Sequence, residues 1–260
     1  MNLDELYTMQ NKIPSVLFIL FSSLQLFAQS NDSVIAMANE SYSQGNYQEA
    51  IGLYEHVLKE DYEAPQLYYN LGNSFFKTNN IPAAILNYER AKRLSPNDED
   101  ILFNLKLANL KTVDKTETIP PLFFKIWWND LANMFSGDRW AIYTITSLWL
   151  CIILICAFVI SKKTALKKLS FGLSIIFLIL TILSFTNAYQ RYRNANSQDE
   201  AIVFSVSVIV KSSPDENGTD LFLLHEGTKV MIMDEIGEWN KIMLSDGSVG
   251  WLRKETVEII

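Results

Sequence analysis

Two long uncharged stretches dominate the hydrophobic pattern of the chain. Residues 140–160 (WAIYTITSLWLCIILICAFVI) and residues 169–188 (LSFGLSIIFLILTILSFTNA) contain no charged side chain. About 20 apolar residues, at a rise of roughly 1.5 Å each, cross a hydrocarbon core of roughly 30 Å, and neither stretch is amphipathic. The pattern therefore predicts a hairpin of two transmembrane helices that contacts a lipid bilayer. A pair of buried helices in a soluble domain is the alternative.

The loop between the two stretches predicts the orientation of the hairpin. Residues 161–168 carry Lys162, Lys163, Lys167 and Lys168 and no acidic residue. Short lysine-rich loops stay in the cytoplasm, so the segments on either side of the hairpin are expected together on the opposite side of the membrane. Three arginines flank the spans and weaken this contrast without reversing it.

An apolar run near the start of the chain has the length of a signal-peptide core. It covers residues 13–27 (IPSVLFILFSSLQLF) and is followed by Ala28–Ser30, a small-x-small pattern suited to cleavage. We therefore predict a signal peptide over residues 1–30, with an uncleaved anchor as the alternative. Met1 and Met9 both stay open as the start site. Under either interpretation, the residues that follow this run are exported across the membrane.

The segment after this run contains a repeat of 34 residues. Its landmarks in residues 65–98 are Tyr68, Leu71, Gly72, Phe75, Ala84, Tyr88, Ala91 and Pro96. They follow the tetratricopeptide pattern W-x2-L-G-x2-Y…A-x3-F…P, in which small residues allow two helices to cross closely. Residues 31–64 keep the same register, and residues 99–112 have the spacing of a third first helix. Residues 31–112 are thus predicted to form two repeats and a capping helix.

Resemblance to the tetratricopeptide family implies a concave face, lined by first helices, that binds peptides. The candidate contact residues are Asn39, Tyr42, Tyr69, Asn70, Asn73, Phe76, Lys77 and Phe103. Asn39 and Asn70 stand where family members that grip a C-terminal carboxylate have two asparagines. The basic positions of that clamp hold Ile35, Asp100 and Asn104. The resemblance therefore does not extend to the binding of an acidic C-terminal tail. Plain packing is the alternative role for each aromatic residue.

Residues 113–139 connect the repeats to the first span. They begin as a polar linker that ends in a proline pair. Residues 122–135 (LFFKIWWNDLANMF) then concentrate aromatic side chains next to the span, which is typical of a helix in the headgroup region. A simple extension of the first span is the alternative.

Residues 200–260 change to short β-rich runs separated by turn residues such as Asp246-Gly247. Several short strands within about 60 residues predict a small closed all-β barrel. The segment resembles bacterial SH3-type domains, and its landmarks are Val208, Val210, Lys211, Pro214, Gly227, Thr228, Trp239, Asp246, Gly247, Gly250 and Trp251. Trp239 and Trp251 are candidates for an aromatic groove, with a place in the core as the equal alternative.

Charge and composition exclude several classes of function. The net charge of −7 is divided into −5 for residues 31–119, −7 for residues 199–260 and +5 for the rest. Nucleic acid is therefore not an expected partner, since binding phosphates requires basic modules. His56 and His225 have no zinc spacing or nucleophile partner, and no phosphate-binding or dinucleotide motif is present. We predict no catalytic site, metal or cofactor.

The order of the segments resembles the BatE-type family of the Bacteroides aerotolerance (Bat) operon. That family combines a tetratricopeptide superhelix, a two-helix transmembrane hairpin and an SH3-like barrel in one multidomain membrane protein. The resemblance implies a bacterial inner-membrane location, periplasmic modules, von Willebrand A-domain Bat proteins as partners and a role in oxidative-stress tolerance. We expect a non-catalytic envelope scaffold. A cell-wall sensor or anchor that binds peptidoglycan peptides is the alternative.

Overall fold

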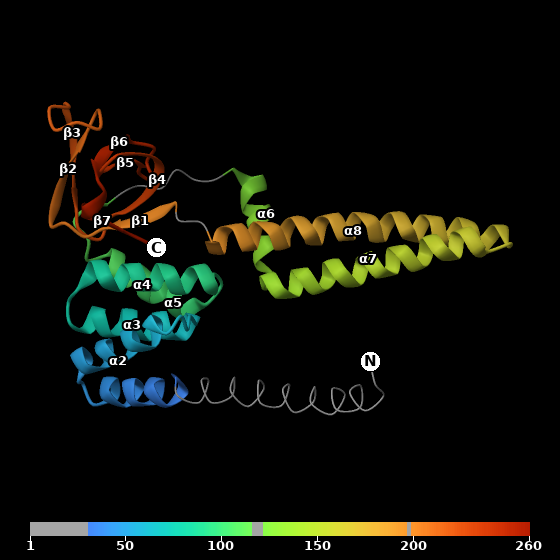
Figure 1. Ribbon diagram of the computed structural model, residues 1–260, viewed down its shortest axis with the longest axis horizontal. Coiled ribbons are helices and arrows are strands. Elements are labelled where there is room, and N and C mark those ends of the chain that lie inside the picture. Colours follow the sequence, from blue (N-terminus) through green and yellow to red (C-terminus); the bar gives the residue numbers. More distant parts are fainter. Residues whose placement is uncertain (1–30, 116–121, 197–198) are drawn as a thin grey trace, which may run out of the picture.

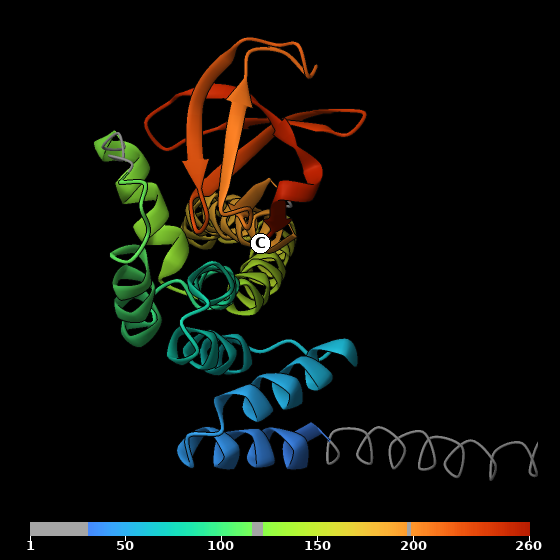
Figure 2. The ribbon, with the colours of Figure 1, turned by 90° about the vertical axis from the view of Figure 1, so that its left-hand side faces the viewer.

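The computed structural model describes residues 31–115, 122–196 and 199–260 of the chain. The predicted signal peptide, residues 1–30, lies outside the described residues. Helical repeats and a β-sheet lie together at one end of a long helical hairpin, which extends away from both (Figure 1). The view turned by 90° shows the hairpin end-on behind the junction of the repeats and the sheet (Figure 2).

The first part is a stack of antiparallel helices with the predicted tetratricopeptide layout. A helix over residues 31–43 is followed by α2 (Tyr47–Lys59), α3 (Pro65–Lys77), α4 (Ile81–Leu94) and α5 (Glu99–Asn109). Local sequence sets the ends of these helices. The Asn80 side chain accepts a hydrogen bond from the Ala83 amide at the start of α4, and Asp98 accepts two at the start of α5.

Gly72 lets α3 and α4 approach each other. A Cβ atom at this position would lie 2.8 Å from two ring carbons of Tyr88, a residue that is buried in α4. Ala84 is fully buried at the same crossing, and its carbonyl oxygen would lie 3.3 Å from that Cβ. The small residues of the repeat pattern therefore have the close-packing role that the sequence predicts.

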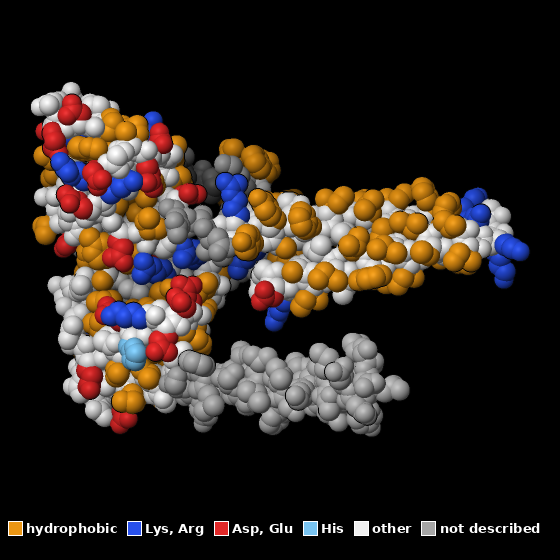
Figure 3. All heavy atoms as spheres, in the orientation of Figure 1, with side chains coloured by type: hydrophobic (Ala, Val, Ile, Leu, Met, Phe, Trp, Pro, Cys, Tyr) orange, Lys and Arg blue, Asp and Glu red, His pale blue; other side chains and the backbone are white. Residues whose placement is uncertain are grey.

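Two helices form the hairpin, α7 (Gly137–Ile160) and α8 (Thr164–Asn196), and both are long and apolar enough to cross a membrane. Hydrophobic side chains cover the visible face of the hairpin along its length, and basic side chains gather at its free end (Figure 3). The facing surfaces carry small polar groups, with the hydroxyls of Ser147 and Thr181 2.9 Å apart. Because α8 begins at Thr164 and ends at Asn196, it is longer than the predicted second span and the connection is shorter than predicted.

The aromatic segment before the hairpin is a separate helix, α6 (Phe123–Asn133). Ser136 caps the start of α7, so the chain bends between the two helices. The Trp140 indole donates to the carbonyl oxygen of Ala132 at 3.0 Å, and the Trp128 indole donates to the Gln190 amide oxygen at 2.5 Å. These bonds hold α6 across the base of the hairpin (Figure 1).

The C-terminal part is one antiparallel sheet. Its elements are β1 (Glu200–Val203), β2 (Ser207–Lys211), β3 (Asp220–His225), β4 (Lys229–Ile236), β5 (Trp239–Met243), β6 (Val249–Arg253), the short 3-10 helix η1 (Lys254–Thr256) and β7 (Val257–Ile259). The strand order is β3-β2-β6-β5-β4-β1-β7. Val203, Val210, Ile242 and Leu252 are fully buried in its core.

The prediction of a closed barrel is wrong. Within the described residues, the edge strands β3 and β7 pair with β2 and β1 and not with each other. The edge of the sheet at β7 is covered by α4 instead. Arg90 donates to the carbonyl oxygen of Ile259 at 2.8 Å, and Arg93 donates to that of Ile260. Because these groups satisfy main-chain acceptors at the edge, the sheet need not close to protect it.

A shared hydrophobic core joins the sheet to the repeats. Ile85 of α4 and Leu105 of α5 pack in one buried cluster with Ile202 of β1 and Ile260. The sheet thus occupies the groove between α4 and α5, where the second helix of a third repeat would pack. The helix predicted to cap the stack, α5, is itself covered by the C-terminal part of the chain.

Candidate peptide-binding face and the junction of the modules

Paired asparagine and tyrosine side chains link successive helices of the repeat stack. The Tyr54 hydroxyl donates to Asn39 Oδ1 at 2.6 Å, and Asn70 Nδ2 donates to the same oxygen at 3.1 Å. Asn39 comes from the first helix of repeat one, Tyr54 from its second helix and Asn70 from the first helix of repeat two. One amide oxygen therefore ties three helices together.

The same arrangement recurs 34 residues later. The Tyr88 hydroxyl donates to Asn73 Oδ1 at 2.7 Å, and Asn104 Nδ2 donates to that oxygen at 3.0 Å. Asn104 Nδ2 also lies 2.8 Å from the Tyr69 hydroxyl oxygen. Asn104 was missed as a site residue, although its position 34 residues after Asn70 is a signal in the sequence.

The buried tyrosines of this network stay neutral hydrogen-bond donors near neutral pH. Burial raises the pKa of Tyr54 to about 12, although a hydrogen bond donated by the Asn70 amide opposes the shift. Burial, together with the neighbouring Tyr69 and Tyr42, raises the pKa of Tyr88 as well. Each hydroxyl therefore keeps the proton that it donates to an asparagine.

A cavity of about 310 Å³ lies beside this network and is lined mainly by the first helices of the repeats. It is lined by Tyr42, Tyr69, Asn73, Phe76, Lys77, Tyr88, Asn104 and Leu107. Five of the eight predicted contact residues are among them. Asn39 and Asn70 belong to the neighbouring hydrogen-bond set, and Phe103 is 62% exposed on α5.

The cavity combines aromatic walls, amide groups and positive charge. The Lys111 ammonium lies 4.3 Å from the centre of the Phe76 ring, and the exposed Lys77 lines the cavity. Within the described ranges, the hydrogen bonds of Asn39 and Asn73 use their Oδ1 atoms as acceptors. Their Nδ2 groups can therefore donate to a bound main-chain carbonyl. This chemistry suits a peptide segment with an apolar side chain and a nearby acid.

The two candidate groove tryptophans have different surroundings. Trp251 is 8% exposed, and Lys241 Nζ lies 5.9 Å from the centre of its ring. Trp239 is half-buried, and the Arg253 guanidinium lies 5.4 Å from its ring centre. Trp251 is therefore buried, whereas Trp239 presents a partly open indole face.

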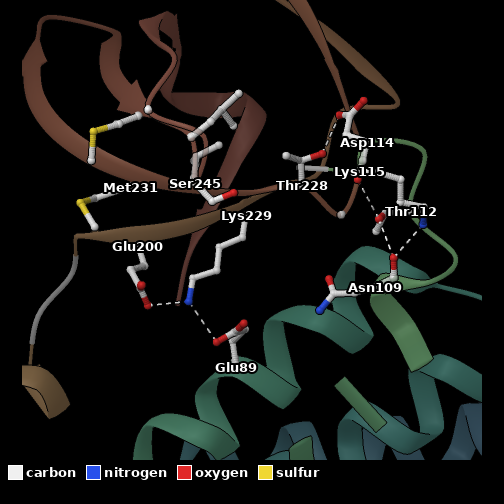
Figure 4. Close-up of a pocket in the computed structure, with 15 residues that line it drawn as sticks. Glu89, Asn109, Thr112, Asp114, Lys115, Glu200, Thr228, Lys229, Met231 and Ser245 are labelled. Carbon is white, nitrogen blue, oxygen red and sulfur yellow. Dashed lines mark hydrogen bonds and ion pairs between the residues drawn. The ribbon is translucent and has the colours of Figure 1, made fainter. Parts of the chain in front are cut away.

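A larger cavity of about 670 Å³ lies between the repeats and the sheet (Figure 4). At its edge Lys229 of β4 bridges two carboxylates, at 3.0 Å from Glu89 of α4 and 2.8 Å from Glu200 of β1. Glu89 is almost fully buried, and Lys92 lies 3.4 Å from the same carboxylate. The charges at this edge are therefore balanced across the junction.

Asp114 forms a second link across the same junction. Its carboxylate accepts hydrogen bonds from the His225 main-chain amide at 2.7 Å and the Thr228 hydroxyl at 2.7 Å, and it lies 2.9 Å from His225 Nδ1. Burial alone would raise the pKa of Asp114, but the bonds from Thr228 and His225 and the charge on His225 lower it below its ordinary value. His225 thus has a structural role that the sequence did not indicate.

Among the described residues, no group of three or more His, Cys, Asp and Glu side chains is arranged to hold a metal ion. The side chains at the junction of the repeats and the sheet pack against each other and form hydrogen bonds and ion pairs. A concave face with amide donors and aromatic walls is suited to recognition of a polypeptide.

Comparisons with known proteins agree with the helical layout. A family model described as "Tetratricopeptide repeat" matches residues 35–99. Two curated relatives, both named "Tetratricopeptide repeat protein 16", from Macaca fascicularis and Homo sapiens, are each 36% identical over 75 residues. That stretch is 29% of this chain and 8% of each relative.

The similarity is thus confined to the repeats, and the chain spans only a small part of the length of those relatives. Tetratricopeptide repeats are typically non-catalytic modules for protein–protein interaction, and the matches indicate no enzyme family. The chain therefore carries a tetratricopeptide interaction region, two apolar helices that could span a membrane, and a C-terminal antiparallel sheet.

Proposed function

We propose that this protein is a non-catalytic membrane scaffold that binds a partner protein on the concave face of its repeats. The observation that carries the proposal is the cavity beside the asparagine–tyrosine network. The cavity offers the Asn73 amide, aromatic walls and the cationic Lys77. We therefore assign to the partner an extended segment with an apolar side chain and a nearby carboxylate.

The hairpin in this proposal spans the bilayer, and α6 lies in its headgroup layer. The exposed apolar surface of α7 and α8 supports the first assignment, since lipid tails would cover it. Phe123 and Trp127 support the second because both are more than three-quarters exposed on α6. The repeats and the sheet then share one side of the membrane, and the lysine-rich end of the hairpin faces the other.

This orientation predicts which sites react with a membrane-impermeant maleimide. We expect Asn217→Cys, in the exposed connection between β2 and β3, to be labelled in spheroplasts. Lys163→Cys, in the connection between α7 and α8, should be labelled only after the membrane is permeabilised. Cys151 and Cys156 are replaced by alanine in both variants to remove the background. Labelling of Lys163→Cys in intact spheroplasts would reverse the orientation.

We also propose that the sheet is an open form of the bacterial SH3-like fold. The landmark glycines support this proposal, because Gly227 and Gly247 have φ values of +84° and +90° at the turns where the motif requires them. The resemblance to the BatE-type family makes von Willebrand A-domain membrane proteins the first partners to examine. The physiological setting in this proposal is the envelope response to oxidative stress.

A photo-crosslinking residue at Lys77 tests the concave-face proposal in native membranes. We expect a discrete crosslinked partner at this position and none when the same residue replaces Lys59, an exposed lysine at the end of α2. Lys77→Glu should reduce recovery of the partner at least about tenfold, because it reverses a charge at the cavity. Asn73 is unsuitable as the test, since it also holds the buried Tyr88 hydroxyl. Equal crosslinking from Lys59 and Lys77 would refute binding on this face.

A further inference from the structure

A second cavity, of about 540 Å³, lies where the repeats meet the base of the hairpin. We refer to it as the basal cavity. One wall is the end of α4, with Arg93 and Leu94, and the other is formed by the start of α7 and the end of α8. Ala141, Phe185 and Ala188 make its apolar part. The base of the hairpin lies next to the repeats in Figure 1.

The apolar and cationic parts of the basal cavity follow the boundary of the predicted spans. Ala141, Phe185 and Ala188 belong to the uncharged stretches of α7 and α8, whereas Arg191 lies just beyond the second stretch. Phe185 and Tyr189 stack with ring centres 6.4 Å apart, and both are exposed. A molecule that fills the cavity would therefore meet the hairpin's apolar surface at one end and arginine at the other.

Arg191 carries a half-buried charge without a carboxylate partner among the described residues. Its Nη1 atom donates to the neutral Asn133 side chain at 3.1 Å, and the ion pairs of the described ranges do not include it. Arg93 lines the same cavity and donates to the carbonyl oxygen of Ile260. Asp138 is the acid at the cavity, and it is exposed in the first turn of α7, where the helix dipole offsets its charge.

Burying a charge without a partner costs free energy. An anion bound beside Arg191 would offset this cost through charge-assisted hydrogen bonds. Both arginines also line an adjacent cavity of about 490 Å³, where Glu89, Asp199 and Glu200 face them together with two lysines, so the cationic end is confined to the basal cavity. Guanidinium groups bind phosphate through two parallel N–H bonds. The apolar end, by contrast, is continuous with helix surfaces suited to lipid tails.

We propose that the basal cavity binds one anionic phospholipid, with its phosphate at Arg93 and Arg191 and one acyl chain along Ala141, Phe185 and Ala188. This inference rests on the proposed insertion of the hairpin into a bilayer. A lipid held there contacts α4, α7 and α8 at once. It fixes the repeats against the hairpin and so sets the orientation of the concave face above the membrane.

Lipid titration of the full chain in neutral detergent tests this proposal. Native mass spectrometry would compare dioleoylphosphatidylglycerol with the zwitterionic dioleoylphosphatidylcholine. We expect the anionic lipid to bind roughly tenfold more tightly, the ratio that one charge-assisted contact supplies. Arg191→Gln should reduce this ratio to below about threefold. Arg193→Gln is the matched control, because it removes an exposed charge from the same helix outside the cavity, and it should keep the preference.

A second variant tests the apolar end independently of charge. Ala141 is exposed at the cavity, so Ala141→Trp fills space without disturbing a buried core and should weaken the binding of both lipids. Equal affinities of the two lipids, or equal losses in Arg191→Gln and Arg193→Gln, would overturn the proposal. Circular dichroism of each variant shows whether it has folded.

Two further measurements separate the possible reasons for failure. Glycerol 3-phosphate at millimolar concentration carries the same phosphate without the tails. If it displaces the anionic lipid, the site takes a soluble phosphate ester and the lipid assignment is wrong. Flotation with liposomes reports insertion alone. A chain that floats but shows no preference for anionic lipid refutes the basal-cavity site and leaves the membrane scaffold standing, whereas a chain that does not float refutes both.

Discussion

Replacing Gly72 with leucine is expected to unfold the repeat region at temperatures where the native protein is folded. A Cβ atom alone would lie 2.8 Å from Cδ1 and Cε1 of Tyr88. The ring cannot easily move, since Tyr88 is 1% exposed and its hydroxyl is bonded to Asn73. Overpacking of this kind costs about 1–3 kcal/mol and sometimes more. A short repeat stack has little stability to lose.

Far-UV circular dichroism of the full chain in detergent measures this effect as a lower midpoint of the first helical transition. The full chain is needed because the repeats share their core with Ile202 and Ile260, which an isolated repeat fragment would lack. Gly52→Leu is the control, since Gly52 is exposed on α2 and a Cβ there meets nothing within 4 Å. Leucine is the better helix former, so this control should be neutral or slightly stabilising. Equal melting of Gly72→Leu and the native chain would show that the close crossing of α3 and α4 is wrong.

Lys229→Ala is expected to weaken the junction between the repeats and the sheet. The substitution leaves the nearly buried Glu89 and the neighbouring Glu200 without the lysine that lies 3.0 and 2.8 Å from them. Removing one partner of a fully buried ion pair costs about 3–5 kcal/mol. The Lys229 side chain is 31% exposed, so we expect a loss of about 2–3 kcal/mol. Denaturant unfolding and hydrogen exchange in α4 and β4 would measure it.

Lys92→Ala provides a matched comparison at the same carboxylate. The Lys92 side chain is 37% exposed and lies 3.4 Å from Glu89. Exposed ion pairs contribute about 0–1 kcal/mol, so this variant should lose far less stability. If Lys229→Ala and Lys92→Ala lower the free energy of unfolding equally, Lys229 has no special role at the junction.

The pH dependence of stability gives a second readout for Lys229. Burial alone would lower its pKa, but the charges and hydrogen bonds of Glu89 and Glu200 raise it above the ordinary value of 10.5. A raised pKa means that this stabilisation is fully present below pH 10.5 and is lost as the pH rises through the folded-state value. The difference in unfolding free energy between the native protein and Lys229→Ala should therefore shrink above pH 10.5.

Local patterns in the sequence determined the helical elements of this protein. The repeat register followed from small residues at Gly72 and Ala84 and from aromatic residues at fixed spacing, because close helix packing leaves few residue types acceptable there. The two apolar helices followed from length and the absence of charge. Resemblance to the tetratricopeptide family implied eight concave-face residues, and five of them line one cavity.

The tertiary structure decided what those elements contact. Asn104 enters the asparagine–tyrosine network, and Asp114 and Thr228 meet although they are separated by more than 100 residues. The sheet is open, and Arg90 and Arg93 of α4 cover its edge at β7. Hydrophobic periodicity records which face of an element is buried but not which distant element buries it. The junction, the basal cavity and the open sheet depend on which elements pack against each other. Only the assembled fold specifies these pairings.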